Sequence, residues 1–116
     1  MLENRIRKLL LQAGVDPSLT GYEYLRMAVK LCYEDKSHLR YVTKQLYWDI
    51  AKEFDVKPSS VERCMRFAIE SMKKTEGGWF RKEVVGLLEN KRELTNSQFL
   101  AVCVEILMMQ EAEDVK

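Results

Sequence analysis

Five side chains near the middle of the sequence can form directed hydrogen bonds. They are Ser59, Ser60, Glu62, Arg63 and Arg66. An arginine can donate two parallel hydrogen bonds to O6 and N7 of guanine, a glutamate can accept from N4 of cytosine, and serines can bond bases or phosphates. Because residues three and four apart share one helix face, the spacing predicts a helical surface suited to the edges of nucleic-acid bases.

A helix, a turn and a second helix are predicted to carry these side chains. The first helix starts near Val42, with inward residues Leu46, Tyr47, Ile50, Ala51 and Phe54. Residues 55–58 interrupt it, because Pro58 disfavours helix at the preceding residue yet suits a first helical turn. The second helix runs from about Ser59 to Lys74, with inward residues Val61, Cys64, Met65, Ala68, Ile69 and Met72.

Residues 43–74 thus have the anatomy of a helix-turn-helix. Ala51 permits close approach of the two helices, Val56 can insert the turn into the core, and Val61 anchors the second helix. In this motif the second helix offers its N-terminal residues to a major groove, while the first lies against the backbone. The residues predicted to contact phosphates are Lys44, Gln45, Tyr47, Lys52 and Lys57.

The same pattern has a plainer interpretation as a solvated helical surface. Two amphipathic helices joined by a short turn occur in many proteins that do not bind DNA, and Glu62 with Arg66 is a common i,i+4 ion pair. The net charge is +1, whereas a DNA-binding domain usually has a basic surface. Residues 40–74 carry eight basic and five acidic side chains, hence +3, which is a weak asymmetry.

The rest of the apolar pattern is also helical. Further helices are predicted from Leu2 to a stop at Gly14, from Thr20 to about Tyr33, over 79–88, and after caps at 95–97. The polar tail from residue 111 is expected to fray. With no strand pattern, the sequence predicts a single all-α domain of six helices over residues 1–116.

Composition excludes several other classes. No apolar run approaches the ~20 residues of a membrane span, and no signal peptide is visible, so the cytoplasm is expected. Cys32, Cys64 and Cys103 form no CxxC pair and are predicted to be buried thiols, without a metal site. His38, the only histidine, is predicted on the surface. Without a nucleophile motif or phosphate-binding loop, no enzyme and no cofactor are expected.

Four blocks of the sequence resemble one known family. They are GYEYLRMAVKLCYED (21–35), TKQLYWDIAKEF (43–54), VERCMRFAIE (61–70) and TNSQFLAVCVEIL (95–107). In order and spacing they resemble the C-terminal effector domain of the sporulation stage-zero response regulator of endospore-forming Firmicutes. The resemblance covers nearly the whole chain. It implies a six-helix transcription-regulator domain that binds TGNCGAA-like boxes in double-stranded DNA, often as tandem protomers.

The resemblance also implies roles for individual residues. The family's base-reading glutamate and arginine correspond to Glu62 and Arg63, and a further arginine corresponds to Arg66. Ser60 stands where the family has a guanine-reading arginine, and Phe67 stands where it has a histidine. Since serine cannot make the bidentate guanine contact, about 1–3 kcal/mol of discrimination is at stake, and a related but different box is expected.

Two protein partners follow from the same resemblance. In the family, the segment before the last helix contacts the RNA polymerase sigma subunit. Here that segment, 75–94, is shorter and matches poorly, so no individual roles carry over. The wide apolar belt of the last helix, including Leu100, Met108 and Met109, predicts a homodimer contact on tandem sites.

The family regulator normally carries a phosphorylated receiver domain before this module, and nothing in 1–116 can be one. The chain is therefore either a fragment or a receiverless regulator. The main alternative function is a protein-interaction module that kept the fold but lost specific DNA binding. Ser60, Glu62, Glu70 and the near-zero net charge favour that alternative.

Overall fold

The computed structural model describes residues 1–74 and 94–114. Within these ranges the chain is helical and contains no strand, which confirms the all-α fold class. The α-helices are α1 (Leu2–Ala13), α2 (Thr20–Glu34), α3 (Ser37–Arg40), α4 (Tyr47–Phe54), α5 (Pro58–Glu70) and α6 (Asn96–Asp114). A π-helical turn, η1 (Val42–Leu46), leads into α4, and a 3-10 turn, η2 (Ser71–Lys74), follows α5.

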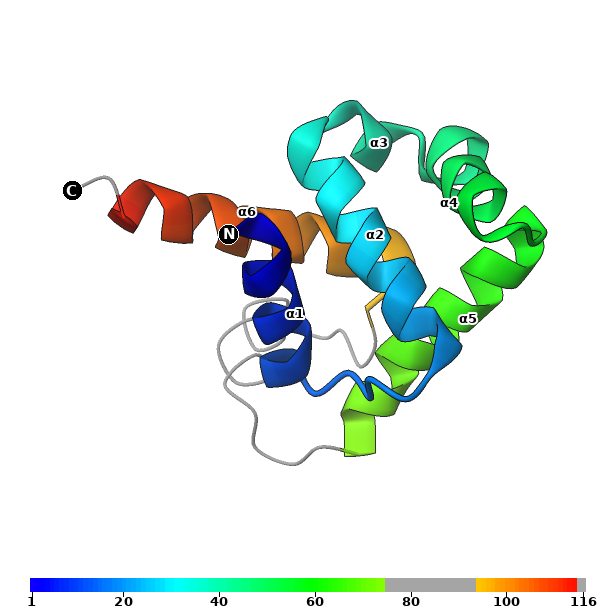
Figure 1. Cartoon of the computed structure of the whole chain (residues 1–116), viewed down its shortest axis with the longest axis horizontal. Helices are drawn as coiled ribbons and strands as arrows, with labels where there is room; N and C mark the ends of the chain where they lie inside the picture. Colours follow the sequence, from blue (N-terminus) through cyan, green and yellow to red (C-terminus); the bar gives the residue numbers. More distant parts are fainter. Residues whose placement is uncertain (75–93, 115–116) are drawn as a thin grey trace.

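Helix α2 lies at the centre of the molecule and packs against α1, α5 and α6 (Figure 1). Its inner face carries Leu25, Ala28, Val29 and Cys32, none of which is exposed. The largest side chains that pack around it are fully buried; they include Ile6, Leu9, Leu10, Met65, Phe99, Leu100 and Leu107. Full burial of such a side chain contributes about 1.5–3 kcal/mol, so this core fixes the positions of the surrounding helices.

Close approach of α2 to α5 depends on Gly21. A Cβ atom at this position would lie 2.0 Å from the carbonyl oxygen of Cys64 and 3.0 Å from the Cβ of Ala68. Backbone atoms cannot move aside as a flexible side chain can, so only glycine permits this separation. Gly21 therefore sets where α5 lies relative to the core.

A glycine in the left-handed conformation ends α1. Gly14, with φ 95°, follows α1, and its N–H bonds the carbonyls of Leu10 and Leu11. The N–H of Val15 also bonds the Leu10 carbonyl at 3.0 Å, and its side chain is buried. This is a Schellman ending with its apolar contact, and it confirms the predicted stop at Gly14.

The segment after α2 differs from the prediction, because Ser37–Arg40 forms the short helix α3. His38 is 8% exposed, so the prediction of a surface histidine was wrong. Its Nδ1 lies 3.1 Å from the Asp35 carbonyl oxygen, and its Nε2 lies 3.4 Å from Asp49 Oδ2. The Asp35 carboxylate accepts from the Ser37 N–H at 2.9 Å, which starts the turn and lowers the pKa of Asp35.

The C-terminal helix is longer than predicted, because α6 continues through Asp114 instead of fraying at residue 111. Two contacts hold its last turns: the Tyr33 hydroxyl donates to Glu111, and Arg5 pairs with Asp114. The predicted helix over 79–88 lies outside the described residues. The six α-helices of the described residues therefore differ from the six that were predicted, because they include α3 and do not include the helix over 79–88.

The thiols and charged groups of the described residues form no metal site. Cys32 and Cys103 are buried as predicted, whereas Cys64 is half-buried. Burial raises the pKa of Cys32 to about 12 and raises that of Cys103 as well, so both thiols stay protonated. No group of three histidine, cysteine or carboxylate side chains comes together in the described ranges. None of the described helices is long and apolar enough to span a membrane.

Candidate nucleic-acid interface

Helices α4 and α5 pack on each other with a three-residue turn between them (Figure 1). Ala51 is 3% exposed and Val61 is fully buried, as the helix-turn-helix prediction requires. Val56 is 37% exposed, so the prediction that it inserts the turn into the core was wrong. The backbone closes the turn instead: Asp55 adopts φ 54°, and the Val56 N–H bonds the Ala51 carbonyl at 3.0 Å.

The outer face of α5 carries the predicted base-contacting side chains. With 3.6 residues per turn, Arg63 lies about 160–200° around the helix from the buried residues Val61 and Met65, so it points away from the core. Arg63 and Ser59 are exposed, and Ser60 is half-exposed. No described residue forms an ion pair with Arg63. Its guanidinium is therefore available to an external acceptor.

Glu62 and Arg66 are paired with each other. The Nε of Arg66 donates to Glu62 Oε1 at 3.0 Å, and the two side chains are 56% and 39% exposed, respectively. This is the i,i+4 ion pair expected if the outer face of α5 is simply a solvated helical surface. An exposed pair of this kind contributes only ~0–1 kcal/mol, so a DNA base can compete for either partner at small cost.

The N-terminus of α5 is open to an anion. Pro58 occupies the first turn, and Lys57 at the N-cap position makes no side-chain capping bond. The N–H groups of Ser60 and Val61 bond the Lys57 carbonyl at 3.0 and 3.2 Å, while the Ser59 N–H has no partner among the described residues. The free N–H of Ser59 at the helix start, with Lys57 beside it, suits a phosphate oxygen.

Four of the five residues predicted to contact phosphates lie on the surface; they are Lys44, Gln45, Lys52 and Lys57. Tyr47 is only 7% exposed, and its hydroxyl accepts a hydrogen bond from Asn96, so burial argues against the predicted phosphate contact. The burial agrees with the apolar pattern, which predicted that Tyr47 points inward.

Two exposed aromatic residues were not included in the predicted contacts. Trp48 is 61% exposed and lies four residues from both Lys44 and Lys52, on the outer side of α4. Phe67 is 60% exposed on α5. Both residues fall at positions where the helical period points outward, so the sequence could have predicted that they are exposed. Aromatic residues are enriched at protein interfaces, so both rings are candidates for contact with a partner.

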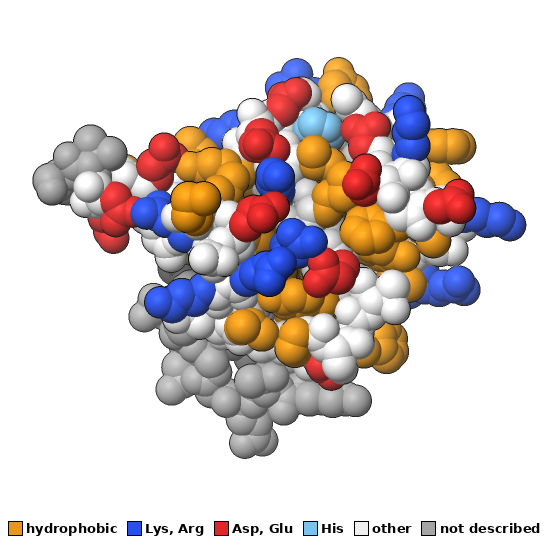
Figure 2. All heavy atoms as spheres, viewed as in Figure 1, with side chains coloured by type: hydrophobic (Ala, Val, Ile, Leu, Met, Phe, Trp, Pro, Cys, Tyr) orange, Lys and Arg blue, Asp and Glu red, His pale blue; other side chains and the backbone are white. Residues whose placement is uncertain are grey.

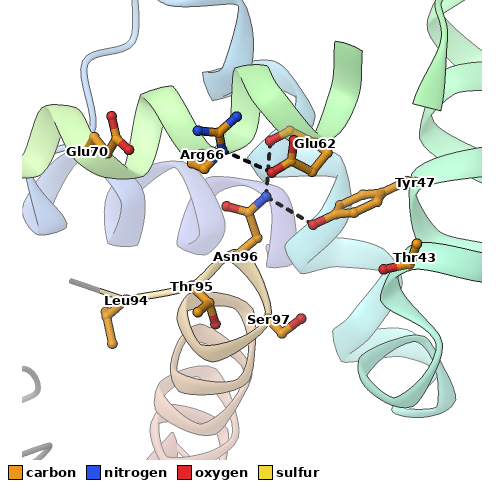
Figure 3. A pocket seen from close by; sticks show the side chains of 9 residues that line it. All are labelled: Thr43, Tyr47, Glu62, Arg66, Glu70, Leu94, Thr95, Asn96 and Ser97. Atoms are coloured by element: carbon orange, nitrogen blue, oxygen red, sulfur yellow. Dashed lines mark hydrogen bonds and ion pairs between the residues drawn. The ribbon is translucent and has the colours of Figure 1, made fainter. Parts of the chain in front are cut away.

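A pocket of about 410 Å³ lies where the start of α6 meets α4 and α5 (Figure 3). Its lining residues are Thr43, Tyr47, Glu62, Arg66, Glu70, Leu94, Thr95, Asn96 and Ser97. Thr95 and Gln98 cap α6 reciprocally, each side-chain oxygen accepting from the other's backbone N–H at 3.1 Å, which confirms the predicted cap. Glu62 and Arg66 thus border both this pocket and the outer face of α5.

Charge is mixed over the surface seen in Figure 2, where basic and acidic side chains are interspersed. This agrees with a net charge of +1 for the chain. Attraction to a polyanion would therefore come from a local set of cations rather than from the whole surface.

The family comparison gives the context for this geometry. The family model described as Sporulation initiation factor Spo0A C terminal matches residues 6–107. The chain belongs to this family. The match covers both helices of the helix-turn-helix and confirms the resemblance seen in the four sequence blocks. The chain is therefore a DNA-binding effector domain of the sporulation-regulator type, and its family is not a catalytic one.

Proposed function

We propose that this domain regulates transcription by placing α5 in the major groove of double-stranded DNA. Arg63 and Arg66 donate to guanines, Glu62 accepts from a cytosine, and Ser59 and Ser60 bond a base or a phosphate at the start of the helix. The observation that carries the proposal is the position of Arg63, which points away from the core with no ion-pair partner among the described residues.

The first helix of the motif supplies the backbone contacts in this proposal. Lys44, Gln45 and Lys52 on η1 and α4, together with Lys57 at the start of α5, bond phosphates on either side of the groove. Trp48 adds an indole N–H donor between two of these lysines. Such contacts fix the register of α5 without reading sequence.

The preferred DNA sequence is expected to differ from the family box, because Ser60 cannot read guanine as an arginine does. Selection of sites from a random DNA pool tests both parts of the proposal. Enrichment of a related box that lacks one guanine preference is the expected result. Recovery of the unaltered family box would refute the altered specificity, and absence of any enriched sequence would contradict the proposed function.

Salt dependence tests the electrostatic part. Binding to the selected box should weaken steeply between a low and a physiological salt concentration, because each neutralised phosphate releases a counterion. A mobility shift at the two concentrations measures this slope. Absence of binding even at low salt would instead indicate a protein-interaction module built on the same fold.

Two protein contacts belong to the same proposal. Met108 and Met109 on α6 are 37% and 53% exposed, and we place the contact between tandem protomers on this apolar surface. Light scattering should show two protomers on a tandem site, and a single protomer at saturation would contradict the dimer. The segment 75–94, most of it outside the described residues, is proposed to contact the sigma subunit. Replacing residues 75–93 by a Gly/Ser linker of equal length, which keeps the buried Leu94, should abolish capture of that subunit and leave DNA binding intact.

A further inference from the structure

Asn96 joins three helices through one side chain. Its Nδ2 donates to the Tyr47 hydroxyl on α4 at 3.0 Å and to the backbone carbonyl of Glu62 on α5 at 3.1 Å (Figure 3). Asn96 itself is the first residue of α6 and is 8% exposed. The two hydrogens of one amide group therefore tie the two helices of the helix-turn-helix to the start of a third.

The direction of these bonds is chemically determined. A backbone carbonyl can only accept, so the nitrogen of the Asn96 amide, and not its oxygen, must face Glu62. Both N–H donors are then used, one on each helix of the motif. No buried side-chain nitrogen or oxygen in the described ranges lacks a partner, and the two bonds of Asn96 favour one relative placement of the helices.

The position of the bridge connects it to DNA recognition. It holds the backbone of Glu62, whose carboxylate bonds Arg66 on the outer face of α5. It also holds Tyr47 in the first turn of α4, next to the exposed residue Trp48. A change in the α4–α5 angle would therefore move base-reading and phosphate-bonding side chains relative to each other.

We propose that Asn96 is a positioning residue for sequence-specific DNA binding, which acts by setting the angle between α4 and α5 without touching DNA. The inference rests on the proposed function, since it assigns a role within the same interface. Loss of the bridge should reduce affinity for the preferred box, which needs base and backbone contacts together. It should have little effect on affinity for random DNA, which needs only phosphate contacts.

The decisive variant is Asn96→Asp, which keeps the shape of the side chain and removes both donors. A negative charge at the start of α6 is favourable for the helix, whose first turn has no acidic residue, so the variant is expected to fold. Ser97→Asp is the matched control, because it adds the same charge one residue further along, on an exposed position, and leaves the amide in place. Tyr47→Phe removes one acceptor and adds no charge.

The measurement is the dissociation constant for the box selected by the wild-type protein and for random DNA, with circular dichroism to verify folding. Relative to Ser97→Asp, the Asn96→Asp variant should lose about tenfold or more on the selected box and less than about threefold on random DNA. Tyr47→Phe should show a smaller loss with the same selectivity. Equal losses on the two DNAs, or no difference from Ser97→Asp, would overturn the inference. Failure of the wild-type protein to select any box would instead refute the proposed function.

Discussion

The two sides of α5 differ in how strongly the rest of the molecule constrains them. On the inner side, Val61, Met65 and Ala68 are fully buried, and Gly21 brings the α2 backbone close to the Cys64 carbonyl. On the outer side, Arg63, Arg66 and Phe67 are exposed, and solvent weakens the ion pair between Arg66 and Glu62. Substitutions on the inner side should therefore change stability, and those on the outer side should change DNA binding alone.

The largest expected effect comes from Gly21→Ala on the inner side. The added methyl group would overlap the Cys64 carbonyl, so α5 must move away from α2, at a cost of about 3 kcal/mol in the free energy of unfolding. Urea denaturation measures this loss. Thr20→Ala, at the exposed preceding position, is the control and should change little. A loss below about 0.5 kcal/mol for Gly21→Ala would show that the two helices separate easily.

Ser60→Arg should act on binding with little effect on folding, because Ser60 is half-exposed on the outer side. The new guanidinium can make the bidentate guanine contact, so discrimination in favour of the family box should rise by about 1–3 kcal/mol. Competition between that box and a variant lacking the guanine measures the change. Ser59→Arg adds the same charge at the neighbouring position; if it produced the same gain, charge and not base reading would be the cause.

Asp55→Gly tests the turn between the two helices. Asp55 has φ 54°, a conformation that costs a residue with a Cβ roughly 1–2 kcal/mol and costs glycine little. After the greater chain entropy of glycine is subtracted, thermal denaturation should show a gain of about 0.5–1 kcal/mol. Asp55→Ala should be less stable than Asp55→Gly, and the reverse order would mean that the backbone conformation does not limit stability.

The smallest effect is expected for the exposed ion pair of α5. Glu62→Gln removes the charge that Arg66 pairs with, yet stability should change by less than about 0.5 kcal/mol, since both side chains are substantially solvated. The same variant should lower affinity for a box with a cytosine opposite Glu62, because the amide is a weaker and less selective acceptor. A clear loss of stability with unchanged DNA binding would show that the ion pair stabilises the fold and does not contribute to DNA recognition.

Much of the fold follows from the sequence because helical periodicity and helix ends are local properties. The apolar spacing predicted α1, α2, α4 and α5, and Gly14 and Thr95 marked an end and a start. The burial of His38 could not be predicted from its polar neighbours, since α3 packs against η1, α2 and α6, and α6 is distant in sequence. The continuation of α6 depends likewise on Tyr33 and Arg5, which are distant in sequence.

The candidate interface was predictable on α5 and less so on α4. The outward positions of α5 are fixed by its period, so Ser59, Arg63 and Arg66 lie on the predicted surface. The apolar pattern predicted that Tyr47 points inward, but it could not predict that its hydroxyl accepts a hydrogen bond from Asn96, 49 residues away. A three-helix bridge through one amide leaves no periodic signal, and only the tertiary structure reveals it.

The most direct test of the account is the affinity of Arg63→Ala for the selected box, compared with that of Arg7→Ala. Both residues are exposed arginines, one on α5 and one on α1, so each substitution removes one surface charge. Arg63→Ala is predicted to cost about 1–3 kcal/mol on the selected box and to relax preference at one base pair, while Arg7→Ala has little effect. Equal affinities for the two variants, with unchanged sequence preference, would contradict the placement of α5 in the major groove.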